Sequence, residues 1–172
     1  MVKIPFTPEM VSESKKLADS MGAIRNSILE GGGNRAGFLA ELALCAYFGA
    51  KRVDKANHDI LFLNKRIEIK TKRRTVDPTP YYEGSVAITS EHQISDYYAF
   101  LSLTFGKKSG KNYSRLNSIW LCGFISYEDF IKNCVFYEKG EIDKSNGFVV
   151  LTDMRNIKYR ELIKPEEFKT TI

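Results

Sequence analysis

The sequence predicts a single α/β (or α+β) domain in which helices flank a central mixed sheet. Two observations predict this fold class. Apolar helical segments come first, and a run of strand-like segments around one short helical stretch follows them. The 172 residues are 43% hydrophobic and 27% charged, which is typical of one globular domain with a sizeable core.

Net charge and cysteine content indicate the kind of binding partner and the cellular compartment. The net charge of +5 favours a polyanionic partner. The three cysteines, Cys45, Cys122 and Cys134, lack metal-binding spacing, and their odd number indicates free thiols in a reducing compartment. No signal peptide opens the chain, and no apolar run approaches the roughly 20 residues of a membrane span. We therefore expect an intracellular, cytoplasmic protein without a membrane segment.

Residues 1–33 are expected to form an N-terminal helical segment. A helix over 8–21 would begin with Thr7 as its cap and Pro8 in its first turn. Residues 22–29 are expected to form a second short helix. Three glycines at 31–33 then break it, either as a hinge or as a loop whose amides approach phosphate.

Residues 36–48, AGFLAELALCAYF, predict a helix that Asn34 opens and Gly49 ends. The segment is apolar nearly all round, so it should be packed on several sides. Its one charged residue is Glu41, and a buried carboxylate is costly unless it is paired or binds a cation. The candidate ion-pair partners are Arg25, Arg35 and Arg52.

The central feature is a hairpin that follows a short strand around Arg52. Its strands are residues 59–63 and 66–71, with Asn64-Lys65 as the expected two-residue turn. This turn would place Leu63 opposite Arg66. Alternate residues share a face, and the expected core-facing stripe is Ile60, Phe62, Ile67 and Ile69.

The other face of the hairpin carries charge. Counting back from the turn puts Asp59 opposite Lys70, with Glu68 as the diagonal neighbour roughly 7 Å away. Glu41 adds a third carboxylate if its helix packs beside the hairpin. Such a cluster repels itself unless a cation sits among the acids, and hard oxygen ligands suit Mg²⁺ or Mn²⁺. Such an ion activates water and polarises a phosphoryl oxygen, which is the chemistry of phosphodiester hydrolysis.

The pattern of Asp59, eight residues and then Glu68-Ile69-Lys70, after a helix with Glu41, resembles the PD-(D/E)XK nuclease superfamily. Restriction endonucleases and archaeal-type Holliday junction resolvases belong to it. The resemblance implies a restriction endonuclease-like αβββαβ core over about 34–106, followed by C-terminal strands and a helix over 107–172. The family's usual proline before the first acid is replaced by His58.

The same resemblance assigns roles to these residues. It implies that Asp59, Glu68, Glu41 and the Ile69 carbonyl bind the metal. It also implies that Lys70 orients or activates the attacking water. Gln93 and Tyr97 have a spacing similar to that of RecB-like members, which makes Gln93 an accessory candidate.

Two basic segments with tyrosines are predicted to be exposed loops. One follows residue 70 and the other covers 107–115. This composition suits phosphate contacts and base stacking, although solvated loops are the plainer alternative. The candidate nucleic-acid-binding residues are Lys72, Arg73, Arg74, Lys107, Lys108, Lys111 and Arg115.

The remaining predicted elements complete the sheet and its cover. A polar turn or short helix is expected over 90–96, and Ser126 should cap a short helix. The C-terminal YRELIKPEEF predicts a helix or a pair of turns. The expected strands are 84–89, a central strand 97–105, 119–125 and 148–151.

The sequence therefore favours a Mg²⁺-dependent deoxyribonuclease, with an endonuclease preferred. One alternative is a catalytically inactive nucleic-acid-binding module of the same fold. Another is an interaction protein whose basic loops dock on an acidic partner. A homodimer would suit symmetric cleavage, but no apolar stripe in the sequence establishes one.

Overall fold

The structure is a computed structural model, and it describes residues 1–21, 34–55, 58–88, 95–106, 112–143 and 147–172. The chain is α/β with a mixed central sheet and helices, as predicted. The predicted helix at 22–29, the triple glycine, Gln93 and the basic residues 107–111 lie outside the described residues.

Within the described residues, the α-helices are α1 (Pro8–Met21), α2 (Asn34–Phe48), α3 (Tyr127–Asn133) and α4 (Pro165–Thr171). The strands of the central sheet are β1 (Val2–Ile4), β2 (Lys51–Lys55), β3 (His58–Phe62), β4 (Lys65–Arg74), β6 (Tyr97–Phe105) and β7 (Leu116–Ser126). The other strands are β5 (Glu83–Ala87), β8 (Val135–Tyr137), β9 (Ile142–Asp143), β10 (Phe148–Val149) and β11 (Met154–Lys158).

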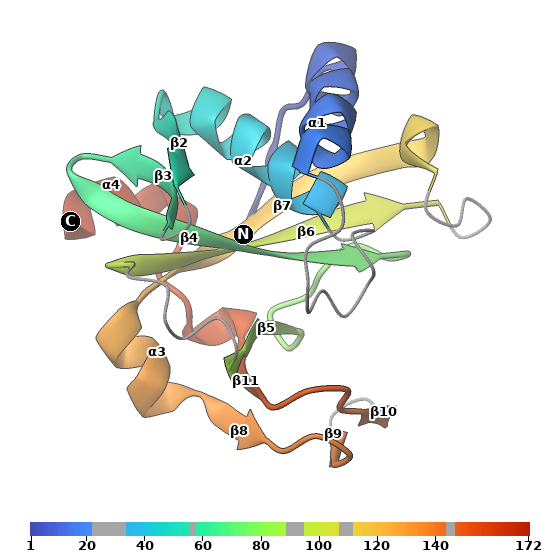
Figure 1. Ribbon diagram of the computed structural model, residues 1–172. Helices are drawn as coiled ribbons and strands as arrows, with labels where there is room; N and C mark the ends of the chain where they lie inside the picture. Colours follow the sequence, from blue (N-terminus) through green and yellow to red (C-terminus); the bar gives the residue numbers. More distant parts are fainter. Residues whose placement is uncertain (22–33, 56–57, 89–94, 107–111, 144–146) are drawn as a thin grey trace.

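The six strands of the central sheet have the order β1-β7-β6-β4-β3-β2 (Figure 1). β4 and β6 are parallel, and the other neighbours are antiparallel. β6 is interior, as its nearly continuous apolar sequence predicted, and residues 98–105 are all buried. This mixed order places the hairpin of β3 and β4 beside the most buried strand.

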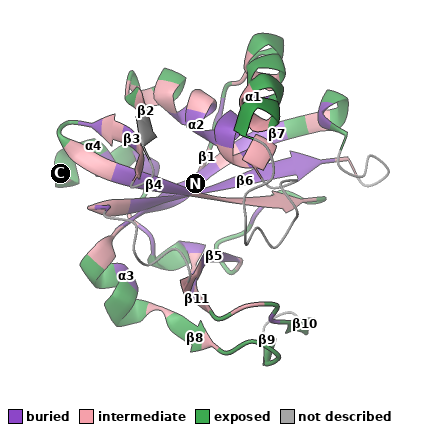
Figure 2. Cartoon of the chain, viewed as in Figure 1, coloured by how far each residue is buried: buried purple, intermediate pink, exposed green. Residues whose placement is uncertain are grey.

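One face of the central sheet is covered by α1, α2 and α4 (Figures 1 and 2). The predicted core stripe of the hairpin is confirmed, because all four of its residues belong to this cluster. Phe168 of α4 stacks on Phe124 of β7, with ring centroids 3.7 Å apart. α2 is buried on several sides, as its apolar sequence predicted.

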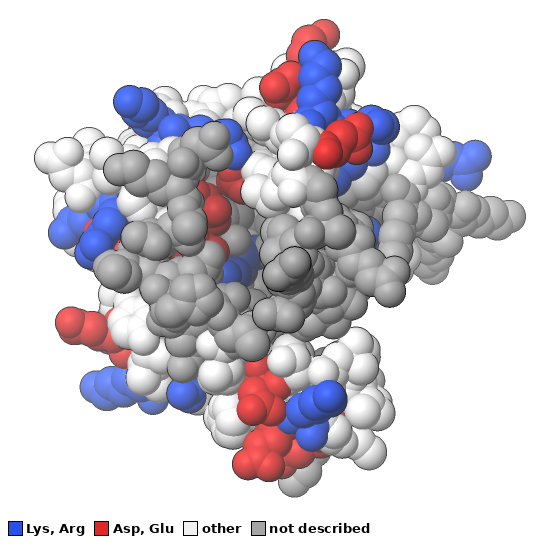
Figure 3. Space-filling model, viewed as in Figure 1, with Lys and Arg blue, Asp and Glu red and all other residues white. Residues whose placement is uncertain are grey.

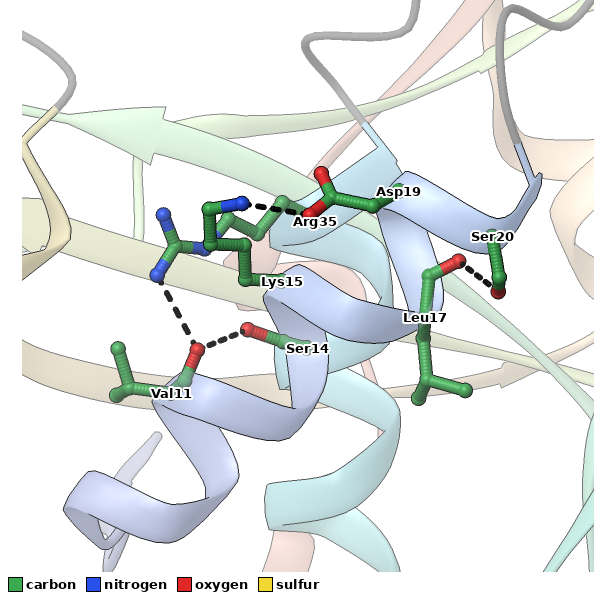
Figure 4. Close-up of polar contacts among 7 residues, drawn as sticks. All are labelled: Val11, Ser14, Lys15, Leu17, Asp19, Ser20 and Arg35. Atoms are coloured by element: carbon green, nitrogen blue, oxygen red, sulfur yellow. Dashed lines mark hydrogen bonds and ion pairs between the residues drawn. The ribbon is translucent and has the colours of Figure 1, made fainter.

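A hydrogen bond from a side chain of α2 to a backbone carbonyl of α1 holds the two helices together. Arg35 of α2 donates from Nη2 to the Val11 carbonyl at 3.2 Å, and the buried Ser14 hydroxyl donates to the same oxygen at 2.9 Å (Figure 4). Thr7 caps α1 as expected, since its hydroxyl accepts from the Met10 N–H at 3.3 Å. Asn34 is the first residue of α2, and Gly49 ends that helix at φ +67°.

The opposite face of the central sheet carries a second cluster. There, α3 and a small sheet of order β5-β11-β8 pack on Tyr98 and Phe100 of β6. The strand expected over 84–89 is therefore real but belongs to this small sheet. Gly84 allows the close approach, because a Cβ there would lie 2.2 Å from the Phe100 ring.

The turn of the central hairpin differs from the prediction. Leu63 and Asn64 form the turn at φ 47° and 61°, and Phe62 pairs with Lys65. Continuing that register puts Asp59 opposite Glu68 rather than Lys70. Phe62 lies in the core, so its burial fixes the register from one end. The pairing moves by two residues, which leaves every side chain on its expected face.

Other boundaries of helices and strands also differ from those predicted from the sequence. β4 continues to Arg74, so Lys72, Arg73 and Arg74 lie on a strand and not in an exposed loop. Residues 148–151 form only a two-residue strand, and β1, β8, β9 and β11 were not expected. The Ser126 cap of α3 and the helix in the C-terminal segment are confirmed. Within the described residues, no helix is long and apolar enough to cross a membrane.

Candidate active site

The candidate site lies where β3 and β4 stop pairing. Their last described pair toward this end is Ile60 with Ile67, although both strands continue beyond it. In this fork the Asp59 carboxylate accepts the backbone N–H of Ile69, with Oδ2 2.6 Å from N. The Asp59 side chain thus accepts a backbone N–H of β4 that lies beyond the last paired residues of β3 and β4. The fork fixes Asp59 against the strand that carries Glu68 and Lys70.

Glu68 and Lys70 point the same way from β4, as the strand period predicted. Lys70 Nζ lies 2.9 Å from Glu68 Oε1. The two side chains are only 16% and 5% exposed, Lys70 and Glu68 respectively. The pair is therefore buried and is not a solvated surface ion pair. The second Glu68 oxygen, Oε2, is also buried and has no hydrogen-bond partner within the described residues.

The charge state of Asp59 shows that the acids influence one another. Burial, followed by the charges of Glu68 and Glu41, raises the pKa of Asp59 to about 8. The Ile69 N–H and the Lys70 ammonium act in the opposite direction. Asp59 is therefore within electrostatic reach of two other carboxylates and one amine. That these groups form one site remains a prediction.

Glu41 is buried on α2 and has the partner that the sequence offered as an alternative to a cation. Arg52 of β2 donates from Nε to Glu41 Oε2 at 2.8 Å. Arg52 pairs with Ile60 along the sheet, so its side chain lies on the face that α2 covers. Glu41 therefore approaches the fork from the α2 side, whereas Glu68 and Lys70 belong to the opposite face with Tyr98 and Phe100.

The residues at the fork are compatible with a divalent cation. When Asp59 is ionised, Glu41, Asp59 and Glu68 carry one more negative charge than Arg52 and Lys70 together compensate. The buried Glu68 oxygen without a partner and the raised pKa of Asp59 are both features that a hard cation would relieve. In the described part of the chain, however, no three His, Cys, Asp or Glu side chains form a group that could hold a metal ion. Glu41 and Glu68 instead lie against Arg52 and Lys70.

The basic residues at the end of β4 contact the protein itself. Arg74 donates to the Glu83 carbonyl at 3.0 Å and lies over the rings of Tyr82 and Tyr159 at 4.6 and 5.7 Å. Burial raises the pKa of Tyr113, and the charge of Arg73 opposes this rise. These arginines are half-buried, so they fasten β4 to its neighbours.

Lys72 continues the row of Glu68 and Lys70 along one face of β4. Burial, followed by the charge of Arg74, lowers the pKa of Lys72 to about 8, and the charges of Glu83 and Asp143 oppose this change. Arg115 is exposed in a 3₁₀ turn, and a role for it in binding nucleic acid remains a prediction.

A buried polar network near Lys72 was not predicted. Asn156 of β11 donates to Glu83 Oε2 at 3.1 Å and to Asp143 Oδ2 at 3.4 Å, and it accepts from Ser85. Asn156 lies 13 to 73 positions along the chain from these partners. No local pattern in the sequence signals such a network.

Charge of both signs reaches the surface on this side of the molecule. Figure 3 shows acidic and basic atoms next to one another near the middle of the face that it views.

Searches against protein-family models and against curated proteins find no match for this chain. The geometry of the fork is therefore the basis for inferring a function.

Proposed function

We propose that this protein is a divalent-cation-dependent nuclease that hydrolyses phosphodiester bonds in DNA, with a restriction endonuclease-like αβββαβ core. The observation that carries the proposal is the pair of Glu68 and Lys70. They are buried side by side, with one Glu68 oxygen unpaired, next to an acid whose pKa is raised to about 8.

Stability alone does not account for this arrangement. Burying an ion pair removes both charges from water, and the pair often contributes less than apolar side chains of similar size would. A further carboxylate, Asp59, beside the pair adds repulsion between like charges. Strongly shifted pKa values with specific charge partners occur preferentially at functional sites. The fork combines a buried ion pair with a carboxyl group of raised pKa, in a protein of net charge +5.

Asp59, Glu68 and the Ile69 carbonyl are the groups that would hold the cation. When bound, Mg²⁺ or Mn²⁺ supplies a polarised phosphoryl oxygen and a bound water of lowered pKa. Glu41 would support the cation through its charge from the α2 side.

The amine of Lys70 has a separate task. It is positioned by Glu68 and by burial, so it can hold the attacking water and offset the negative charge that develops on the phosphate. Because the site is shielded from bulk water, each of these charge interactions is stronger than it would be at the surface.

The net positive charge of the protein favours DNA as the substrate. We favour endonuclease action over exonuclease action. The excess of lysine and arginine gives a sequence-independent attraction to the phosphate backbone. A homodimer would suit symmetric cleavage of two strands.

A non-catalytic nucleic-acid-binding module is the second candidate. One observation favours it, since the described acids do not form a ready group of three for a metal ion. Salt-sensitive DNA binding without cation-dependent cleavage would support this candidate.

The test is a panel of supercoiled, linear, branched, flapped and single-stranded DNA, incubated with Mg²⁺ or Mn²⁺. We expect cleavage by the wild type and a loss of about a hundredfold or more in Glu68→Gln and Lys70→Met. Lys164→Met is the matched control, because it removes a lysine from an exposed ion pair with Glu167. It should cleave like the wild type.

Two outcomes would reject the assignment. If Lys70→Met and the wild type cut at the same rate, Lys70 has no catalytic task. If no substrate is cut while DNA still binds, the binding module is the correct interpretation.

A further inference from the structure

The loop between β4 and β5, residues 75–82, belongs to the first basic segment with tyrosines, and the proposed chemistry does not use it. Tyr81 in this loop is 69% exposed, the highest value for a large hydrophobic or aromatic residue in the described part of the chain. A ring so open to water contributes little to the core. Tyrosine is enriched at binding surfaces, because its ring is apolar and its hydroxyl is polar.

Backbone hydrogen bonds fix the loop on both sides of Tyr81. Arg160 donates its N–H to the Pro80 carbonyl at 2.9 Å, and Tyr159 donates its N–H to the Tyr82 carbonyl at 2.9 Å. Both donors belong to the 3₁₀ turn that follows β11. The exposed ring is therefore carried by an anchored backbone, and a ligand that stacks on it has little loop ordering to overcome.

An arginine lies beside the exposed ring. The Arg160 guanidinium lies 5.6 Å from the centre of the Tyr81 ring, and the Arg160 side chain is 52% exposed. Its ion pair with Glu161 is long, with 3.9 Å between Nε and Oε1. A guanidinium has five N–H donors, so such a contact leaves it able to bind an anion. An open ring next to an exposed guanidinium suits a nucleic-acid base and its phosphate.

A row of basic residues leads from the fork toward this ring. Lys70, Lys72 and Arg74 alternate along one face of β4, and the Arg74 guanidinium lies 4.6 Å from the centre of the Tyr82 ring. Lys70 and Arg74 are four residues apart, which is about 13 Å along a strand. Because phosphates follow one another at about 3.4 Å along one strand of B-form DNA, a few nucleotides reach from the fork to the loop.

We propose that Tyr81 and Arg160 form a binding site for an unpaired base and its phosphate, so that the protein prefers single-stranded or splayed DNA to continuous duplex DNA. The bases of a duplex are stacked on one another, whereas an unpaired base can lay its face on an aromatic ring. The proposal deepens the proposed function by naming the form of the substrate, and it rests on that function only for the choice of DNA as the ligand.

The experiment measures DNA binding with a chelator present, by fluorescence anisotropy of a labelled thymidine oligonucleotide and of a blunt duplex of the same length. We expect the wild type to bind the single strand more tightly. Tyr81→Ala should weaken single-strand binding about tenfold and leave duplex binding unchanged, whereas Tyr81→Trp should keep the affinity. Arg160→Gln should reduce the slope of log affinity against log salt concentration by about 0.7 for the single strand.

Tyr47→Ala and Lys16→Gln are the matched controls. Tyr47 is an exposed tyrosine of α2, and Lys16 is an exposed cation of α1 whose contact with Glu13 is also long, at 3.5 Å. Both helices cover the other face of the central sheet (Figure 1), so neither change should alter DNA binding. Tyr81 and Arg160 are exposed as well, so their variants should unfold at midpoints close to that of the wild type.

The outcomes separate this site from the nuclease proposal. Equal affinity of the wild type for single strand and duplex, equal losses in Tyr81→Ala and Tyr47→Ala, or no DNA binding at all would each overturn the site. If Tyr81→Ala removes the preference for single strands while no DNA is cut, the site stands and the nuclease proposal fails. If DNA is cut and single-strand binding does not depend on Tyr81, the nuclease proposal stands and this site is rejected.

Discussion

Replacing Asp59 by Asn should change how the stability of the cation-free protein depends on pH. The pKa of Asp59 is raised from 3.8 to about 8 by burial and by the charges of Glu68 and Glu41. A raised pKa in the folded state gives stability that is complete below the unfolded pKa and is lost as the pH rises toward 8. The Asn side chain can still accept the Ile69 N–H, so the fork should keep its geometry.

The size of the effect follows from the number of protons. Between the two pKa values the folded protein binds one more proton than the unfolded chain, which corresponds to about 1.4 kcal/mol per pH unit. From about pH 5 to about pH 7, the wild type should therefore lose up to about 3 kcal/mol that Asp59→Asn does not lose. The proton is shared with neighbouring carboxylates, so this figure is the upper bound for the cluster.

The assay is urea unfolding with a chelator present, at several pH values across this range. Asp19→Asn is the matched control, because Asp19 lies in an exposed ion pair with Lys15. Its stability curve should run parallel to that of the wild type. Parallel curves for Asp59→Asn and the wild type would refute the reasoning, because they would mean that no proton is taken up at the fork on folding. Mg²⁺ should also stabilise the wild type more at the upper end of the range, since the cation competes with that proton.

The remaining predictions concern packing and are all read as the free energy of unfolding in denaturant. Gly84→Ala should cost about 1–3 kcal/mol, because its Cβ would meet the buried Phe100 ring, whereas Gly37→Ala, with open space around it, should not destabilise; equal values would contradict the close approach. Phe168→Ala should cost about 3–5 kcal/mol, since it removes a fully buried ring stacked at 3.7 Å, and a loss below about 1 kcal/mol would show that α4 is not part of the core. Asn156→Ala should cost about 1–3 kcal/mol, because two buried carboxylates lose a donor, and a neutral result would mean that water replaces that donor.

Some parts of the site were predictable because they depend on local periodicity. Glu68 and Lys70 are two residues apart on a strand, so any pairing places them on one face. α2 and the burial of Glu41 followed from an apolar segment with one charge. The hairpin existed as predicted, although the turn was placed one residue too late.

Other parts depend on contacts between distant segments. The sequence offered three arginines for Glu41. Of the two that the structure describes, Arg35 and Arg52, the packing of β2 against α2 brings Arg52 to it. Arg73 and Arg74 had the composition of an exposed basic loop. The structure places both on β4, where they are half-buried and Arg74 lies over the ring of Tyr82.

The sequence by itself determined which residues carry charge and on which face of their element they lie, because those properties repeat every 2 or 3.6 residues along the chain. Only the tertiary structure decided that β3 and β4 separate beside Asp59, that Arg52 holds Glu41, and that residues 84–87 join a second sheet. These features arise where segments far apart in the chain compete for the same space and the same hydrogen-bond partners, and no local pattern records that competition.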